Sequence, residues 1–192
     1  MFTFYQSPGS SSMAAHIALH EVGAEFESRW LSFASKEHRG AAFREVNPEG
    51  KVPALLVDGR LLTEVAAILF YLARRYPAAK LIPDDVEGQA QAVSWMSFIA
   101  ATIHPARQVG PERVRQVFEI AETRLGGRDW ALGDYSIADI HLFRLFWRAC
   151  GAAGPAALPF PGLGAHYHRI MARPAVKKTI EIESKVGYEL PA

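Results

Sequence analysis

The sequence predicts two domains, an α/β domain over residues 1–78 and an all-helical domain over residues 84–192. Three observations lead to this division. Strand-like and helix-like patterns alternate in the first 78 residues, strand signals end at Asp84, and the intervening segment from Pro77 to Pro83 reads as a linker. A chain of 192 residues is long enough for two small domains that share an interface.

The elements of the first domain follow from local signals. A short aromatic strand over residues 2–5 leads into a helix that ends at Val22, for which three consecutive serines offer N-caps. An alternating pattern over residues 26–31 predicts a second strand. Asp58-Gly59 between two short runs predicts a hairpin over residues 54–63, and the helix that follows from Glu64 stops before Pro77. We expect a four-stranded mixed sheet with helices on both faces.

The second domain shows only helical signals. A helix is expected over residues 86–103, and an apolar stripe predicts another over residues 114–125 that ends at Gly126-Gly127. Ser136 and Asp139 form a capping-box pattern that marks a strong helix start. Residues 151–164 are rich in glycine, alanine and proline and predict a loop, and a further helix is followed by a last one that opens at Pro174.

Composition excludes several classes of protein. The chain is 49% hydrophobic and 21% charged, and 21 basic against 20 acidic side chains give a net charge of +1, so we expect no nucleic-acid partner. Cys150 is the only cysteine, which rules out an internal disulfide. The N-terminus has no basic leader, and the longest apolar run is far shorter than the ~20 residues that span a bilayer. We therefore expect a cytoplasmic protein with no membrane contact.

Six phrases in order along the chain resemble the glutathione transferase superfamily, closest to its bacterial beta class with theta-like features. They are FYQSPGSSSMAAHIALHE (4–21), NPEGKVPALLVDG (47–59), LLTEVAAILFYLARRYP (61–77), WMSFIAATIHPA (95–106), LGDYSIADIHLF (132–143) and ARPAV (172–176). The resemblance implies a thioredoxin-like first domain with the glutathione site, an all-α second domain that supplies most of the second-substrate pocket, and a homodimer active in detoxification.

The resemblance also implies how glutathione is held. Val52-Pro53 would be a cis bond that leaves the Val52 backbone free to pair with the glutathione peptide, and Lys51 precedes it in the same binding segment. Glu64 would receive the γ-glutamyl ammonium, and the N–H of Val65 its carboxylate. The family usually has serine where this chain has Val65, so one hydroxyl contact is missing.

Glutathione chemistry requires the thiolate, and a hydroxyl at a helix N-terminus can stabilise it. Alignment of the phrase PGSSSMAAHIAL on the family places Ser11 at the position of the beta-class cysteine and of the theta-like serine. Ser10 and Ser12 are neighbouring alternatives, which could equally be helix caps, and Tyr5 at the strand end could donate as in the tyrosine classes.

Two histidines match family positions. His38 resembles the theta-like histidine that binds the glycine carboxylate, and His104 resembles the beta-class active-site histidine, although either could be a solvated loop residue. His16 and His20 lie four residues apart without a third ligand, so no metal is expected. We expect a glutathione transferase that conjugates glutathione to a small electrophile or reduces a peroxide. The alternative is a noncatalytic module of the same fold that serves protein contacts or ligand carriage.

Overall fold

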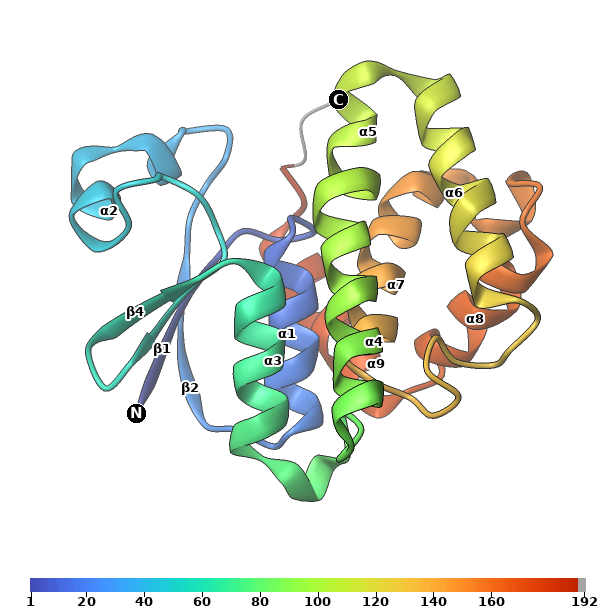
Figure 1. Ribbon diagram of the computed structural model, residues 1–192. Coiled ribbons are helices and arrows are strands. Elements are labelled where there is room, and N and C mark those ends of the chain that lie inside the picture. Colours follow the sequence, from blue (N-terminus) through green and yellow to red (C-terminus); the bar gives the residue numbers. More distant parts are fainter. Residues whose placement is uncertain (190–192) are drawn as a thin grey trace. The chain divides into compact units, whose positions relative to one another are not determined.

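The computed structural model describes residues 1–189 and divides them into two compact units (Figure 1). One, the α/β unit, comprises Met1–Arg75 together with the segment that begins at Pro174. The other, the helical unit, comprises Tyr76–Arg173. Each unit has its own core and is described by itself.

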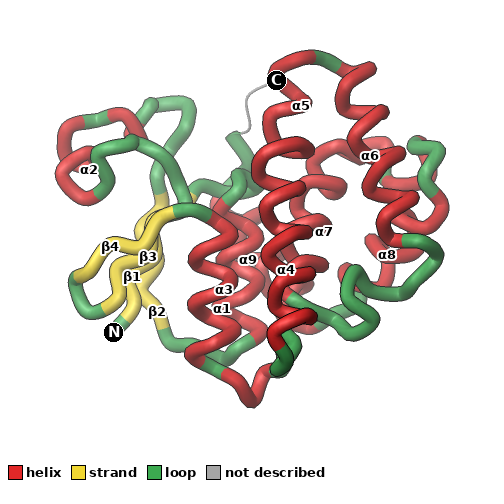
Figure 2. The backbone as a smooth tube through the Cα atoms, in the orientation of Figure 1, coloured by secondary structure: helices red, strands yellow, loops and turns green. Residues whose placement is uncertain are grey.

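The α/β unit is built on one four-stranded sheet (Figure 2). Its strands are β1 (Phe2–Gln6), β2 (Phe26–Trp30), β3 (Ala54–Val57) and β4 (Arg60–Thr63), in the spatial order β2-β1-β3-β4. β1 runs parallel to β2 and antiparallel to β3, and β3 pairs with β4 as a hairpin. Asp58 and Gly59 both have positive φ, the backbone that a two-residue hairpin turn requires. The predicted mixed sheet and hairpin are confirmed.

Helices cover both faces of this sheet, because successive side chains of a strand point to opposite sides. Phe4 contacts His16 of α1 (Ser12–Glu21), with 6.0 Å between the ring centroids. Its neighbour Tyr5 faces the other side and contacts Phe43 of α2 (Ala41–Val46) at 5.4 Å. α3 (Val65–Arg75) lies beside α1 on the first face.

The last helix, α9 (Pro174–Val186), packs against α1 and completes the α/β unit. The expected division at residues 78 and 84 assigned this segment to the helical domain. Its buried side chains include Thr179 and Glu183, both of which bond to residues of the α/β unit.

The helical unit follows the order α4 (Val86–Phe98), a π-helical segment (Ile99–Ile103), α5 (His104–Val109), α6 (Pro111–Leu125), α7 (Ile137–Cys150) and α8 (Pro161–Met171). Its core is built around Trp95, Phe118 and Phe146, which are at most 2% exposed. The capping box predicted for α7 is present, since Asp139 Oδ2 accepts the N–H of Ser136 at 2.9 Å. Within residues 1–189, no helix combines the length and apolar character needed to cross a membrane.

The structure differs from the sequence prediction at two helix boundaries. The helix expected over residues 86–103 changes to a π-helical turn at Ile99, because Pro105 has no N–H and its ring would clash with the carbonyl four residues earlier in an α-helix. α8 begins at Pro161, inside the expected loop of residues 151–164, where a carboxylate from α6 caps its first turn.

Candidate functional site

Ser11 lies at the start of α1, where the residue that caps a helix often uses its side chain to bond the backbone. Its hydroxyl makes no such capping bond. Instead Ser11 Oγ donates to the carbonyl oxygen of Val52 at 2.9 Å, while the side chain stays partly exposed. This contact joins the start of α1 to the segment that precedes β3.

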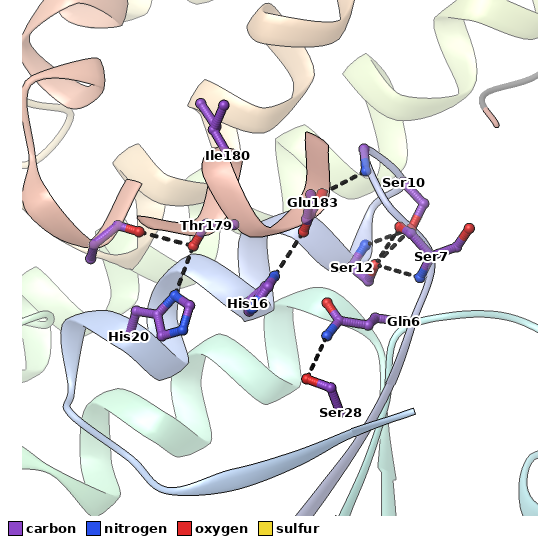
Figure 3. A network of polar contacts seen from close by, with 12 residues as sticks. Gln6, Ser7, Ser10, Ser12, His16, His20, Ser28, Thr179, Ile180 and Glu183 are labelled. Carbon is purple, nitrogen blue, oxygen red and sulfur yellow. Dashed lines mark hydrogen bonds and ion pairs between the residues drawn. The ribbon is translucent and has the colours of Figure 1, made fainter. Parts of the chain in front are cut away.

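The neighbouring serines point inward, as Figure 3 shows for Ser10 and Ser12. Ser10 is 4% exposed and Ser12 is fully buried, and their hydroxyl oxygens are 2.7 Å apart. Ser12 Oγ donates to the carbonyl of Ser7 at 3.0 Å and accepts the Ser7 N–H at 3.2 Å. These two hydroxyls close the loop after β1, which leaves Ser11 as the serine that reaches the surface.

Val52 and Pro53 are buried at the entry to β3, and the bond between them is cis, as predicted. The turn before them is held by Asn47, whose Nδ2 donates to the carbonyl of Lys51 at 2.8 Å. The exposed Lys51 ammonium forms a surface ion pair with Glu49. Sequence reasoning missed this role of Asn47, although an asparagine that begins a turn ending at a glycine, here Gly50, is a recognisable signal.

Glu64 connects β4 to α3 and has a φ of 68°, a left-handed backbone that is rare for a residue with a side chain. Its carbonyl accepts the N–H of Ile68, and its own side chain is exposed. Val65, the first residue of α3, is buried and presents its backbone N–H at the helix N-terminus. Such backbone strain costs about 1–3 kcal/mol and concentrates at ligand sites.

Tyr5 lies on the face of the sheet that α2 covers, and His38 lies in the short helical turn just before α2. The Tyr5 ring is partly buried against Phe43. The His38 ring packs on Phe33, with 4.6 Å between centroids, and within residues 1–189 its buried Nδ1 has no hydrogen-bond partner. Burial, followed by the positive charge of Arg39, holds the pKa of His38 below its ordinary value.

His104 belongs to the helical unit, where it begins α5 directly after the π-helical turn. Although solvent reaches the ring, partial desolvation lowers the pKa of His104, and the charges of Arg144 and Arg107 lower it further. His141 on α7 interacts electrostatically with His104, and its complete burial lowers the pKa of His141 to about 3. Both imidazoles are therefore neutral at pH 7.

A cavity of about 1290 Å³ in the helical unit lies near the N-terminal end of α4 and is lined by residues such as Asp85, Trp95 and Arg124. His104 is not among its lining residues. Across the 189 described residues, no three metal-ligating side chains lie together in a way that could hold an ion.

A buried network in the α/β unit has no counterpart in the sequence analysis (Figure 3). Glu183 of α9 bonds the backbone N–H of Gly9 and the ring of His16. Thr179, one turn earlier, accepts a hydrogen bond from His20 at 3.0 Å. No local signal pairs positions that lie more than 150 residues apart, so sequence reasoning could not find this network.

Comparison with known proteins decides the family. Models of the glutathione S-transferase N-terminal and C-terminal domains match residues 1–74 and 89–174. The chain belongs to the glutathione S-transferase family. Its N-terminal model covers Ser11, Val52 and Glu64, and its C-terminal model covers His104.

Relatives match this transferase over nearly its whole length. It is 31% identical to the glutathione S-transferase GstA of Escherichia coli O157:H7, over 95% of this chain and 98% of that protein. The structure of a sphingomonad glutathione S-transferase complexed with glutathione superimposes with a TM-score of 0.83 at 36% identity, over 95% of this chain and 98% of the other. A ternary complex of BphK, a bacterial transferase, has a TM-score of 0.86 at 31% identity, over 95% and 99%.

Proposed function

We propose that this glutathione transferase binds glutathione on the α/β unit and activates its thiol with the hydroxyl of Ser11. The thiol proton passes to water, and the thiolate sulfur forms a bond to an electrophilic carbon while the leaving group departs with the bonding electrons. With a peroxide as the alternative electrophile, the sulfur bonds one oxygen, the O–O bond breaks, and the departing oxygen keeps the electron pair and takes a proton from water.

The backbone and one carboxylate provide the binding contacts in this proposal. The γ-glutamyl carboxylate binds the N–H of Val65 at the start of α3, where the helix dipole favours an anion. The γ-glutamyl ammonium binds the exposed Glu64 carboxylate, whose left-handed backbone supports a ligand role. The backbone of Val52 pairs with the peptide of glutathione, with Lys51 beside it, and His38 donates to the glycine carboxylate.

One observation carries the assignment of Ser11. Its hydroxyl is the one in the Ser10–Ser12 run that stays partly exposed and leaves the helix uncapped, and it bonds a Val52 carbonyl in the proposed peptide-binding segment. When the sulfur binds there, the hydroxyl can turn from that carbonyl to the thiolate. A thiol pKa lowered by about two units requires only about 2.7 kcal/mol of preferential stabilisation. Ser10, Tyr5 and His104 remain secondary candidates for a catalytic role.

The homodimer, the cytoplasmic location and the role in detoxification belong to the proposal because the chain is a member of the glutathione S-transferase family.

A second candidate function is a noncatalytic module of the same fold. The observation that favours it is Val65, whose apolar side chain begins α3 and cannot add a hydroxyl contact to the γ-glutamyl carboxylate. A lost hydrogen bond to a charged group weakens binding by about 1.5–3 kcal/mol. Affinity for glutathione therefore separates the two functions.

Calorimetric titration with glutathione tests the binding site. We expect saturable binding to the wild-type protein and weaker binding to Glu64→Ala. Glu25→Ala is the matched control, because Glu25 is an exposed glutamate of the same unit that lies before β2. Equal losses in the two variants would place the site elsewhere, and no binding to the wild type would favour the noncatalytic module.

The pH dependence of conjugation to an aryl halide tests the role of Ser11. Ser11→Ala should keep its affinity for glutathione, lose thiolate absorbance at pH 7 and regain rate as the pH rises. A wild-type profile in this variant, with a shifted one in Ser10→Ala or Tyr5→Phe, would assign the donor to that residue instead.

A further inference from the structure

The loop between β1 and α1 is held from two sides. Its own serines close one side, as described above. On the other side, the backbone N–H of Gly9 donates to Oε2 of Glu183 at 2.6 Å. Figure 3 shows this carboxylate on α9, between the loop and His16 of α1.

Glu183 is fully buried, and both of its oxygens have a partner. Oε1 lies 2.9 Å from Nδ1 of His16, which is itself 1% exposed. A carboxylate removed from water is destabilising by several kcal/mol unless donors surround it, and charge-assisted hydrogen bonds of this kind are the strong ones. These two hydrogen bonds therefore hold a charged group at a buried position, where an apolar side chain would have no such desolvation cost.

A second hydrogen bond joins α1 and α9 without Glu183. Thr179 joins the same two helices through a hydrogen bond to His20, and desolvation lowers the pKa of His20 to about 4, so this bond is between neutral groups at pH 7. Glu183 also bonds His16 of α1, but its bond to Gly9 differs from these helix–helix contacts because Gly9 is a loop residue outside both helices. We therefore take the main role of the buried carboxylate to be holding the loop in place through the N–H of Gly9.

Gly9 precedes Ser11 by two residues and has a left-handed backbone with a φ of 67°. The N–H of Ser10 donates to the carbonyl of Ser7 at 3.1 Å, so little freedom is left in the chain between Gly9 and Ser11. The position of the Ser11 hydroxyl depends on where the Gly9 peptide is fixed. Stabilisation of a charge requires a donor held within about 0.5 Å of its productive place.

We propose that Glu183 is a positioning residue for the thiolate site: by holding the N–H of Gly9, it sets the place of the Ser11 hydroxyl beside the sulfur of glutathione. The proposal rests on the function proposed for Ser11. Glu183 does not touch glutathione and acts only through the loop.

The test measures two quantities in the wild type and in each variant. One is the pKa of the bound thiol, obtained from thiolate absorbance, and the other is the conjugation rate as a function of pH. Glu183→Leu should raise the pKa of bound glutathione by about one unit. At saturating glutathione, kcat/KM for the electrophile should then fall by up to about tenfold at pH values well below the wild-type thiol pKa and return to the wild-type value at high pH. The dissociation constant of S-methylglutathione, which has no ionisable thiol, should stay within about twofold of the wild-type value. A loss of folded protein alone would lower all rates equally and leave the profile unchanged.

Two further variants separate positioning from packing. Glu183→Gln keeps an oxygen that accepts the Gly9 N–H, so its profile should return close to the wild-type one. Thr179→Val is the matched control, since it removes a buried hydrogen bond between α9 and α1 but no bond to the loop. It should lower the thermal midpoint and leave the thiol pKa unchanged.

The double variant Ser11→Ala/Glu183→Leu shows whether the effect passes through Ser11. Its thiol pKa should equal that of Ser11→Ala alone, because residues that act through one another are not additive. A shift in Ser11→Ala with none in Glu183→Leu overturns the positioning role and leaves the proposed function standing. No shift in Ser11→Ala overturns both, whatever Glu183→Leu does.

If Glu183→Leu does not fold, Glu183→Asp replaces it. The shorter side chain keeps the carboxylate and draws it back from Gly9, so the thiol pKa should rise in the same direction. A wild-type profile in Glu183→Asp would then overturn the proposal.

Discussion

Glu122 on α6 and Gly162 in the first turn of α8 lie 40 positions apart, and Oε1 of Glu122 accepts the N–H of Gly162 at 2.7 Å. The second oxygen accepts the N–H of Leu163 at 2.7 Å. A Cβ added at Gly162 would lie 2.8 Å from the same carboxylate, so glycine is what allows the close approach. One side chain of α6 thus caps α8 in place of its own N-cap residue, Phe160, which makes no capping bond.

Glu122→Ala should lower the free energy of unfolding by about 1–3 kcal/mol, because two N–H groups at a partly buried helix start lose their acceptor. Urea unfolding followed by circular dichroism measures the change. Glu119→Ala on the same helix is the control, since Glu119 forms a solvent-exposed ion pair with Arg115 that should contribute at most about 1 kcal/mol. Equal losses would show that the cap contributes nothing beyond a surface charge.

Glu64→Gly should stabilise the fold and weaken glutathione binding at once. Glycine adopts the φ of 68° without the strain of about 1–2 kcal/mol that a side chain brings, although its greater freedom in the unfolded chain offsets part of the gain. Thermal unfolding and calorimetry measure the two effects. Lys80→Gly, at a φ of 50° in the helical unit, should stabilise without any effect on affinity. Unchanged glutathione affinity in Glu64→Gly would remove Glu64 from the site.

Stability should fall with pH below about 6.5 because of His141. The folded-state pKa of His141 is about 3 against an ordinary value of 6.5, so between these values the unfolded chain binds a proton that the folded chain excludes. The free energy of unfolding should therefore decrease by about 1.4 kcal/mol for each pH unit lost in that window, from this residue alone. Above pH 6.5 the contribution is constant.

His141→Leu should flatten this slope in urea unfolding at pH 7, 6 and 5. His168→Leu on α8 is the comparison, because it makes the same substitution at an exposed histidine of the same unit. An identical pH dependence in the wild type and His141→Leu would mean that the buried ring accepts a proton in the folded state.

His38→Ala should weaken binding of glutathione but not of γ-glutamylcysteine, which has no glycine carboxylate. The pKa of His38 is lowered, so at pH 7 the neutral ring offers one hydrogen bond to a charged carboxylate, worth about 1.5–3 kcal/mol, or about tenfold or more in affinity. Calorimetry with the two ligands isolates this contact from any change in the loop. Equal weakening of both ligands would assign His38 a role in the structure of the loop instead.

The separate strands, the hairpin and the start of α7 could be predicted because each depends on residues close together in the sequence. Asp58-Gly59 determines its turn, and Ser136 with Asp139 determines its cap, whatever lies elsewhere. The start of α8 and the anchor of the Gly9 loop could not be predicted, since each depends on a carboxylate supplied by a distant helix. At the candidate site, the sequence did not indicate which of the three consecutive serines is the hydrogen-bond donor. The structure distinguishes them, because Ser10 and Ser12 are buried and Ser11 is partly exposed.

The place of α9 has a consequence for the order of events during synthesis. The strands, α1 and α3 leave the ribosome before α9, yet the face of α1 that carries His16 and His20 has its partners at Glu183 and Thr179. Until those residues emerge, the nascent first unit has an uncovered side and a Gly9 loop without its anchor. The α/β unit is thus completed only after the helical unit between its two segments has been translated, and the Ser11 hydroxyl should take its final place only then.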